Sequence, residues 1–176
     1  TSAIDRVPTD SPIFAGRPGT WGGQRAANLL LAQADVIIAM GAQLDLQQTG
    51  FNYSGYSPRA KLVQIFPSQA ELNRAGPPAY AKVLASPDAA LAAILSKIQW
   101  KDQDGWGEYV REVRALVPSL EEANISGPGY INSFRFLKNL SRASQPSDVL
   151  ALCSSGGAFT GSLQNYEIAS GQLATT

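Results

Sequence analysis

Apolar and polar positions divide the first half of the chain into helix-forming stretches and short apolar runs. Residues 24–34 are mostly Ala, Leu and Gln, which favour a helix, and residues 35–41 are an apolar, β-branched run that ends in glycine. Further apolar runs cover residues 60–66 and 81–85, and each precedes a helix-forming stretch. This alternation predicts an α/β fold made of βαβ units, with a parallel sheet and helices on both faces.

Two of these helices carry start signals. Ser68, with Glu71 three positions later, predicts a capping box for a short helix. Ser86, followed by Pro87, predicts the N-cap of an Ala-rich helix over residues 87–97.

The second half of the chain has a different character. Residues 98–130 contain several Trp, Pro and Gly residues around one predicted helix, over residues 106–116, which is typical of a connection between domains. A further helix is predicted over residues 130–141, and residues 148–153 predict a new buried strand.

The composition excludes several kinds of chemistry. The chain has 14 basic and 14 acidic side chains and no net charge, so we expect neither nucleic acid nor an anionic membrane as partner. It has no histidine and one cysteine, Cys153, which excludes Ser-His-Asp, Cys-His and His-zinc sites and an internal disulfide. Cys153 is expected to be a small core residue, and a cofactor would have to carry any chemistry.

Two properties of the whole chain bear on its setting. No apolar stretch approaches the roughly 18 residues that cross a bilayer, and a cytoplasmic location is the default expectation. The chain begins at Thr1 and stops just as an apolar segment begins, so we expect it to be a fragment of a longer protein.

Three glycine-containing loops could bind a ligand. The first, residues 16–23, includes Gly16, Gly19 and Thr20 and leads into a helix, whose amino end attracts phosphate; the alternative is an irregular loop that simply needs glycine. The second follows the strand over residues 35–41, where a parallel sheet presents ligand-binding groups.

In the second loop the candidates are Gly41, Gln43 and Asp45. Asp45 could accept a hydrogen bond from a ribose hydroxyl, or could serve only as a loop cap. The third loop turns from a strand into a helix at Gly156, Gly157 and Ala158, and suits an anion or a diphosphate.

Several of these motifs occur together in a characteristic order. The central domain of thiamine diphosphate enzymes of the acetolactate synthase type resembles this chain at residues 14–28, 34–45, 48–50 and 60–65. The opening of that family's diphosphate-binding third domain resembles residues 156–164 and 171–176.

The resemblance implies a domain organisation and an activity. Residues 1–97 would be a Rossmann-like central domain that lacks its first strand and helix, residues 98–145 an interdomain connector with helices, and residues 146–176 the start of the diphosphate domain. The full-length enzyme would be a homo-oligomer that uses thiamine diphosphate and Mg²⁺ to decarboxylate a small 2-oxo acid and transfer the resulting acyl group. The family's catalytic glutamate and Gly-Asp-Gly metal motif lie outside this sequence, so the chain alone is expected to be inactive.

The resemblance also implies cofactor-binding residues. Gly156, Gly157 and Ala158 match positions that touch the diphosphate, with Gln164 on the following helix, although family members often have Gln-His where this chain has Gly157 and Ala158. A second set matches loops that hold FAD in acetolactate synthases: Gly16, Gly19, Thr20, Gly41, Gln43 and Asp45. FAD remains possible, but the chain has Phe66-Pro67-Ser68 where the family often has Asp-Ile-Asp.

Two other classes of protein share the pattern. A separate Rossmann-like nucleotide-binding module would have the same βαβ alternation and glycine loops, and would bind a dinucleotide without other domains. A non-catalytic scaffold domain would fold and associate with partner subunits without binding either ligand.

Overall fold

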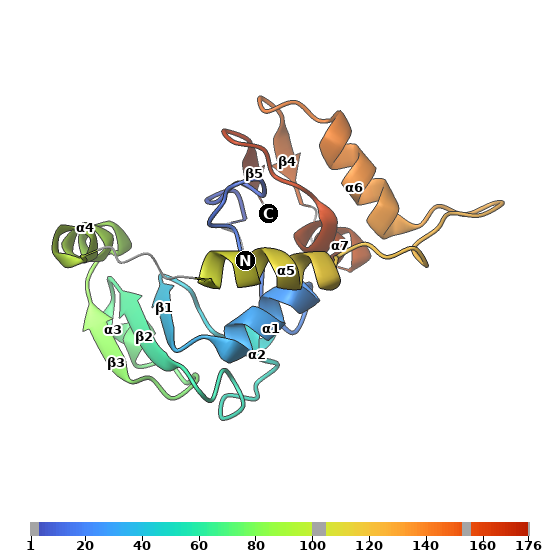
Figure 1. The fold of residues 1–176 in the computed structure, drawn as a ribbon. Coiled ribbons are helices and arrows are strands. Elements are labelled where there is room, and N and C mark those ends of the chain that lie inside the picture. The colour runs from blue at the N-terminus through green and yellow to red at the C-terminus, as the bar shows by residue number, and fades with distance from the viewer. Residues whose placement is uncertain (1–3, 100–104, 153–155, 176) are drawn as a thin grey trace. The chain divides into compact units, whose positions relative to one another are not determined.

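The computed structural model describes residues 4–99, 105–152 and 156–175. The chain divides into two compact units (Figure 1). The sheet unit is Leu31–Asp104, and the discontinuous unit combines Thr1–Leu30 with Gly105–Thr176. The domain limits expected from the sequence, at residues 97 and 145, remain a prediction.

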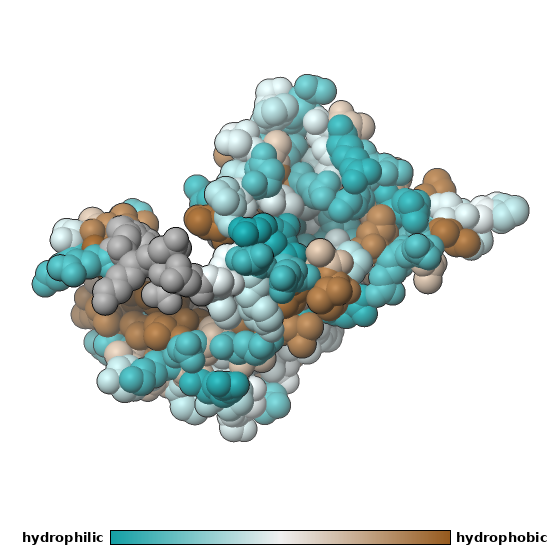
Figure 2. All heavy atoms as spheres, viewed as in Figure 1, coloured by the Kyte–Doolittle hydropathy of each residue, from teal (hydrophilic) through white to brown (hydrophobic). Residues whose placement is uncertain are grey.

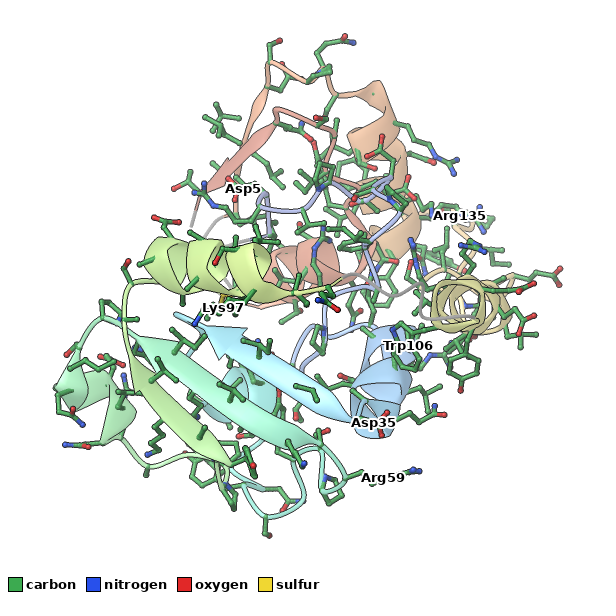
Figure 3. The ribbon with its side chains drawn as sticks, turned by 60° about the vertical axis from the view of Figure 1, so that its left-hand side comes forward. Asp5, Asp35, Arg59, Lys97, Trp106 and Arg135 are labelled. Atoms are coloured by element: carbon green, nitrogen blue, oxygen red, sulfur yellow. The ribbon has the colours of Figure 1, made fainter. Side chains whose placement is uncertain are left out.

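The sheet unit is built on three parallel strands, β1 (Val36–Met40), β2 (Lys61–Phe66) and β3 (Ala81–Leu84), in the order β1-β2-β3 (Figure 1). Val36 pairs with Lys61, and Val63 pairs with Ala81. The predicted α/β class with a parallel sheet is confirmed. Figure 3 shows Asp35 and Arg59 at the amino ends of β1 and β2, so the carboxyl ends lie at the opposite edge of the sheet.

The two faces of this sheet differ in burial. Ala39, Leu44 and Leu62 form a buried cluster with Ile37 on one face. Because side chains alternate along a strand, Val36 and Ile38 lie on the other face, where they are 55% and 43% exposed. Figure 2 shows hydrophobic side chains at the surface in this part of the molecule.

Short helices complete the sheet unit: α2 (Leu46–Thr49), α3 (Gln69–Leu72) and α4 (Pro87–Lys97). The capping box predicted for α3 is wrong, because the Ser68 side chain makes no cap hydrogen bond. The Glu71 carboxylate instead accepts a hydrogen bond from Gln43 and pairs with Arg74. The other start signal is confirmed, since Ser86 Oγ accepts a hydrogen bond from Ala89 N at 3.2 Å.

Replacement of Ser86 by alanine is expected to lower the free energy of unfolding by about 1 kcal/mol, because it removes the N-cap of α4. Ser68→Ala is the matched control, since that side chain makes no cap bond and its loss is expected to cost close to nothing. Urea unfolding of both variants checks this; equal midpoints would contradict the assigned cap.

The discontinuous unit is mainly helical. It contains α5 (Trp106–Leu116), α6 (Ser133–Ala143), α7 (Gly157–Asn165) and the start of α1 (Arg25–Gln33). A two-stranded parallel sheet joins β4 (Val149–Ala151) to β5 (Leu173–Thr175). The helices predicted over residues 24–34, 106–116 and 130–141 are confirmed, apart from a few end residues, and so is a strand within residues 148–152. The prediction that this strand is buried is wrong, because Val149 and Ala151 of β4 are exposed.

Two apolar clusters hold this unit together. Leu152, Leu163, Tyr166 and Ile168 surround one core, in which Tyr166 and Ile168 are 2% and 1% exposed. The other core joins α1 to α5: it contains Ala26, Leu30, Val110 and Val113. Among the described residues, no helix has the length and apolar character that crossing a membrane requires.

Candidate functional site

A cavity of about 100 Å³ lies in the sheet unit, beyond the carboxyl ends of β1 and β2. This is the edge at which parallel sheets present ligand-binding groups. Its lining residues include two of the predicted ones, Gln43 and Asp45, together with Phe51, Tyr53, Glu71 and Arg74.

Polar side chains on one wall of this cavity form a chain of contacts. Gln43 Nε2 donates to Glu71 Oε2 at 3.0 Å, and Arg74 lies 3.4 Å from the same oxygen. Asp45 Oδ1 accepts from Gln47 N at 3.2 Å and so caps α2. The capping interpretation of Asp45 is therefore confirmed, and its contact with a ribose stays a prediction.

Two aromatic side chains, Phe51 and Tyr53, also line the cavity. Phe51 has φ 63° and is 62% exposed, and its ring meets that of Tyr53 edge-on at 6.2 Å between centroids. A bulky residue with a positive φ is strained, and such strain concentrates at ligand sites. The sequence indicated a polar, aromatic loop here, but no pattern in it gives a positive φ for Phe51.

The size of this cavity limits what it can hold. Sites for drug-sized ligands and cofactors measure roughly 300–1,000 Å³, so about 100 Å³ suits one ribose-sized group and does not fit a whole dinucleotide. The predicted site residue Gly41 donates its N–H to Ile65 O at 2.9 Å, so this group is already paired. The sheet unit by itself therefore does not fit FAD.

The remaining residues of the predicted flavin set, Gly16, Gly19 and Thr20, lie in the discontinuous unit. Gly19 N donates to Asn28 Oδ1 at 2.8 Å, and Asn28 Nδ2 donates back to Gly19 O at 3.0 Å. A Cβ at Gly16 would lie 2.8 Å from Ala27 Cβ. These contacts favour the alternative in which the loop needs glycine in order to pack on α1.

Arg17 fixes the same loop to the end of α7, a role that sequence analysis did not identify. Its Nη1 donates to Leu163 O at 3.1 Å and to Tyr166 O at 2.9 Å, and its Nη2 donates to Thr9 Oγ1 at 3.3 Å. Burial lowers the pKa of Arg17 to about 10, so the guanidinium remains charged at neutral pH. No sequence pattern distinguishes this arginine from the exposed ones.

The third predicted site is the amino end of α7. Gly156 precedes the helix, and Gly157 and Ala158 open it. A Cβ at Gly156 or Gly157 would have no atom of the described residues within 4 Å, which leaves room for a ligand on that side. The first N–H groups of a helix have no partner within the helix and carry partial positive charge. This turn fits a diphosphate group.

Gln164, predicted to bind the same cofactor, lies near the other end of α7. A rise of 1.5 Å per residue separates it from Gly157 by roughly 10 Å along the helix. Its Nε2 donates to Gly23 O at 3.2 Å, and its carbonyl accepts from Gln24 Nε2 at 2.7 Å. The structure gives Gln164 a packing role, and its contact with a cofactor remains a prediction.

Two other sequence predictions concern Cys153 and the binding of a metal ion. Cys153 and the two serines after it lie outside the described residues. In the described ranges 4–99, 105–152 and 156–175, no three His, Cys, Asp or Glu side chains come together as a metal site.

Comparison with known proteins identifies the family. Residues 2–94, more than half of the chain, match the family described as thiamine pyrophosphate enzyme, central domain. The chain belongs to the thiamine pyrophosphate enzymes. The resemblance stated from the motifs is confirmed, and the parallel sheet β1-β2-β3 lies within the matched residues of this central domain.

Two curated relatives of this thiamine pyrophosphate enzyme are acetolactate synthase large subunits, one of them a probable one. The chain is 27% identical over 116 residues to acetolactate synthase isozyme 1 large subunit of Escherichia coli K12, and the match covers 66% of the chain. It is 30% identical over 118 residues to a probable acetolactate synthase large subunit of Methanocaldococcus jannaschii, with 65% covered. The match spans only 20% of the length of each relative.

Proposed function

We propose that this chain is part of a thiamine diphosphate-dependent 2-oxo acid decarboxylase or carboligase that resembles the acetolactate synthase large subunit. The order of its parts supports this most: a matched central domain at residues 2–94 is followed by an open, glycine-rich helix start at Gly156. The similarity to two acetolactate synthase large subunits supports the same proposal.

In this proposal the chain's own contribution is to hold the cofactor. The backbone N–H groups of Gly157 and Ala158, at the positive end of α7, would bind the diphosphate. When bound, thiamine diphosphate would supply a nucleophilic carbon for addition to the carbonyl of a 2-oxo acid. Gly156 and Gly157 leave the space for the diphosphate free.

The remaining catalytic groups are proposed to lie outside these 176 residues. The chain has no histidine, and its described part has no metal-ligand cluster. We propose that the activating glutamate precedes this segment and the Mg²⁺ motif follows it, so the chain alone is inactive. The complete protein would be a cytoplasmic homo-oligomer.

A substitution at the α7 turn tests the cofactor role. In the protein encoded by the complete reading frame, Gly157→Val is expected to weaken thiamine diphosphate binding at least tenfold, because the side chain fills the space beside the diphosphate. Within the described part of the chain no atom lies within 4 Å of that Cβ, so the fold is expected to remain intact.

Calorimetric titration of thiamine diphosphate measures the effect, and thermal unfolding without cofactor checks the fold. Gly107→Val is the control, because Gly107 also lies in the first turn of a helix, has no positive φ, and among the described residues its Cβ would meet only Arg111 Nη1, at 3.7 Å. Unchanged cofactor affinity in Gly157→Val would count against the proposal.

The cavity beside Gln43 and Asp45 favours a second candidate, a nucleotide-binding module. Its aromatic and hydrogen-bonding side chains at the carboxyl edge of a parallel sheet suit the ribose of a nucleotide, which is the part of the ligand that the cavity is large enough to hold. Micromolar binding of ADP to the 176-residue chain, lost in Asp45→Ala, would favour this candidate over the first.

A further inference from the structure

The cavity beyond the carboxyl ends of β1 and β2 has a buried polar side chain at its base, Gln64. Gln64 lies in β2, the central strand of the sheet (Figure 1), and pairs in register with Ala39 of β1. Paired residues of a sheet point to the same face, so Gln64 lies on the face that carries the buried apolar cluster. It is thus a polar side chain among apolar neighbours, in a run that the sequence analysis treated as apolar.

The side-chain amide of Gln64 is unpaired but accessible. Gln64 is 8% exposed, and its amide has no hydrogen bond to any described residue. Neither amide atom is sealed from solvent, since the described side-chain atoms that are buried without a partner belong to Asp5, Arg17 and Asn165. A Cβ at Gly76, which also lines the cavity, would lie 3.9 Å from Gln64 Nε2. A nearly buried donor and acceptor are costly to leave unpaired, and a bound group in the cavity would satisfy both.

The charges around the cavity disfavour an anionic group at its base. Asp45 and Glu71 bring two negative charges to the lining. Arg74, the one cation among the described lining residues, lies 3.4 Å from the Glu71 carboxylate and is already paired with it. A phosphate or carboxylate group would therefore meet a net charge of −1. An uncharged hydrogen-bonding group fits better.

The neighbours of Gln64 favour a sugar hydroxyl pair as that group. Asp45 uses Oδ1 to cap α2, which leaves Oδ2 without a hydrogen bond among the described residues. The site therefore offers two acceptors, Gln64 Oε1 and Asp45 Oδ2, and one donor, Gln64 Nε2. Two neighbouring hydroxyls can each donate and accept, and so can use all three atoms. The rings of Phe51 and Tyr53 provide apolar surface for the C–H groups of a sugar.

We propose that Gln64 binds the 2′- and 3′-hydroxyls of a ribose in this cavity, so that the site prefers ribonucleotides to 2′-deoxyribonucleotides. Gln64 Oε1 accepts from one hydroxyl and Nε2 donates to the other, while Asp45 Oδ2 accepts a further hydrogen bond. The phosphates of the nucleotide remain outside the acidic cavity. This inference rests on the second candidate function, the nucleotide-binding module, because it concerns the ligand of the same cavity.

Calorimetric titration of the 176-residue chain with ADP and with 2′-deoxy-ADP tests the proposal. ADP is expected to bind at least about tenfold more tightly, because the deoxy compound leaves one amide atom of Gln64 unpaired. Gln64→Met keeps the length of the side chain and removes the amide, so it is expected to reduce this preference to less than about threefold.

Gln69→Met is the matched control for Gln64→Met. Gln69 is exposed on α3, its amide bonds to Asn73, and it does not line the cavity, so the preference for ADP should be unchanged. Thermal unfolding without ligand verifies the fold of both variants. Gln64→Met is expected to keep or raise the midpoint, because it removes a buried amide that has no protein partner.

Three results would overturn the inference, and they separate it from the second candidate function. Equal affinity for ADP and 2′-deoxy-ADP would refute the contact with the hydroxyls and leave a nucleotide-binding module in place. A preference that persists in Gln64→Met would assign the contact to another residue. Absence of ADP binding by the folded chain would refute the second candidate function together with this inference.

Discussion

Replacement of Gly23 by alanine is expected to lower the free energy of unfolding by about 3 kcal/mol. A Cβ at this position would lie 2.0 Å from the carbonyl oxygen of Gly19 and 2.5 Å from its nitrogen. Both are backbone atoms, so no side-chain rotation relieves the overlap. The displaced Gly19 would also lose its paired hydrogen bonds with Asn28.

Gly107→Ala provides the matched control for Gly23→Ala. Gly107 lies in the first turn of α5, and among the residues that the structure describes its added Cβ would meet only Arg111 Nη1, at 3.7 Å. Because alanine favours a helix more than glycine does, this variant is expected to keep or slightly raise the stability. Chemical unfolding of the two variants compares them, and equal midpoints would refute the close packing described for Gly23.

Loss of the Arg17 side chain is expected to have an effect of similar size. Arg17→Met should lower the free energy of unfolding by about 3 kcal/mol, because it leaves the carbonyls of Leu163 and Tyr166 without their donor. Arg17→Lys should recover only part of this, since an ammonium group cannot reproduce the planar fork of donors.

Arg59→Met is the control for the Arg17 variants. Arg59 is exposed at the amino edge of the sheet (Figure 3), so its replacement is expected to change stability by less than about 0.5 kcal/mol. Urea unfolding of these three variants provides the comparison. A loss at Arg17→Met no larger than that at Arg59→Met would contradict the anchoring role of Arg17.

The regular elements could be predicted because their signals are local. The β-branched run over residues 35–41 and the Ala-rich run after Ser86 each depend on neighbouring residues, and both became the expected elements. The capping box at Ser68 failed because Glu71 found partners outside its own helix, Gln43 and Arg74. Gln43 lies 28 residues before Glu71, so the local motif could not reveal that contact.

The candidate site was predictable only in part, for the same reason. The loop after β1 was placed at the correct edge of the sheet, since every parallel strand ends there. No spacing in the sequence encodes the positive φ of Phe51. The same is true of the hydrogen bond between Arg17 and Leu163, which are 146 residues apart in the sequence.

Release of CO₂ from pyruvate, with and without thiamine diphosphate and Mg²⁺, tests the central claim most directly. We expect cofactor-dependent release by the protein encoded by the complete reading frame and none by the purified 176-residue chain. Release by the 176-residue chain alone would contradict the account, because it would require an activating group that we place outside these residues. Release that does not depend on thiamine diphosphate would contradict it too.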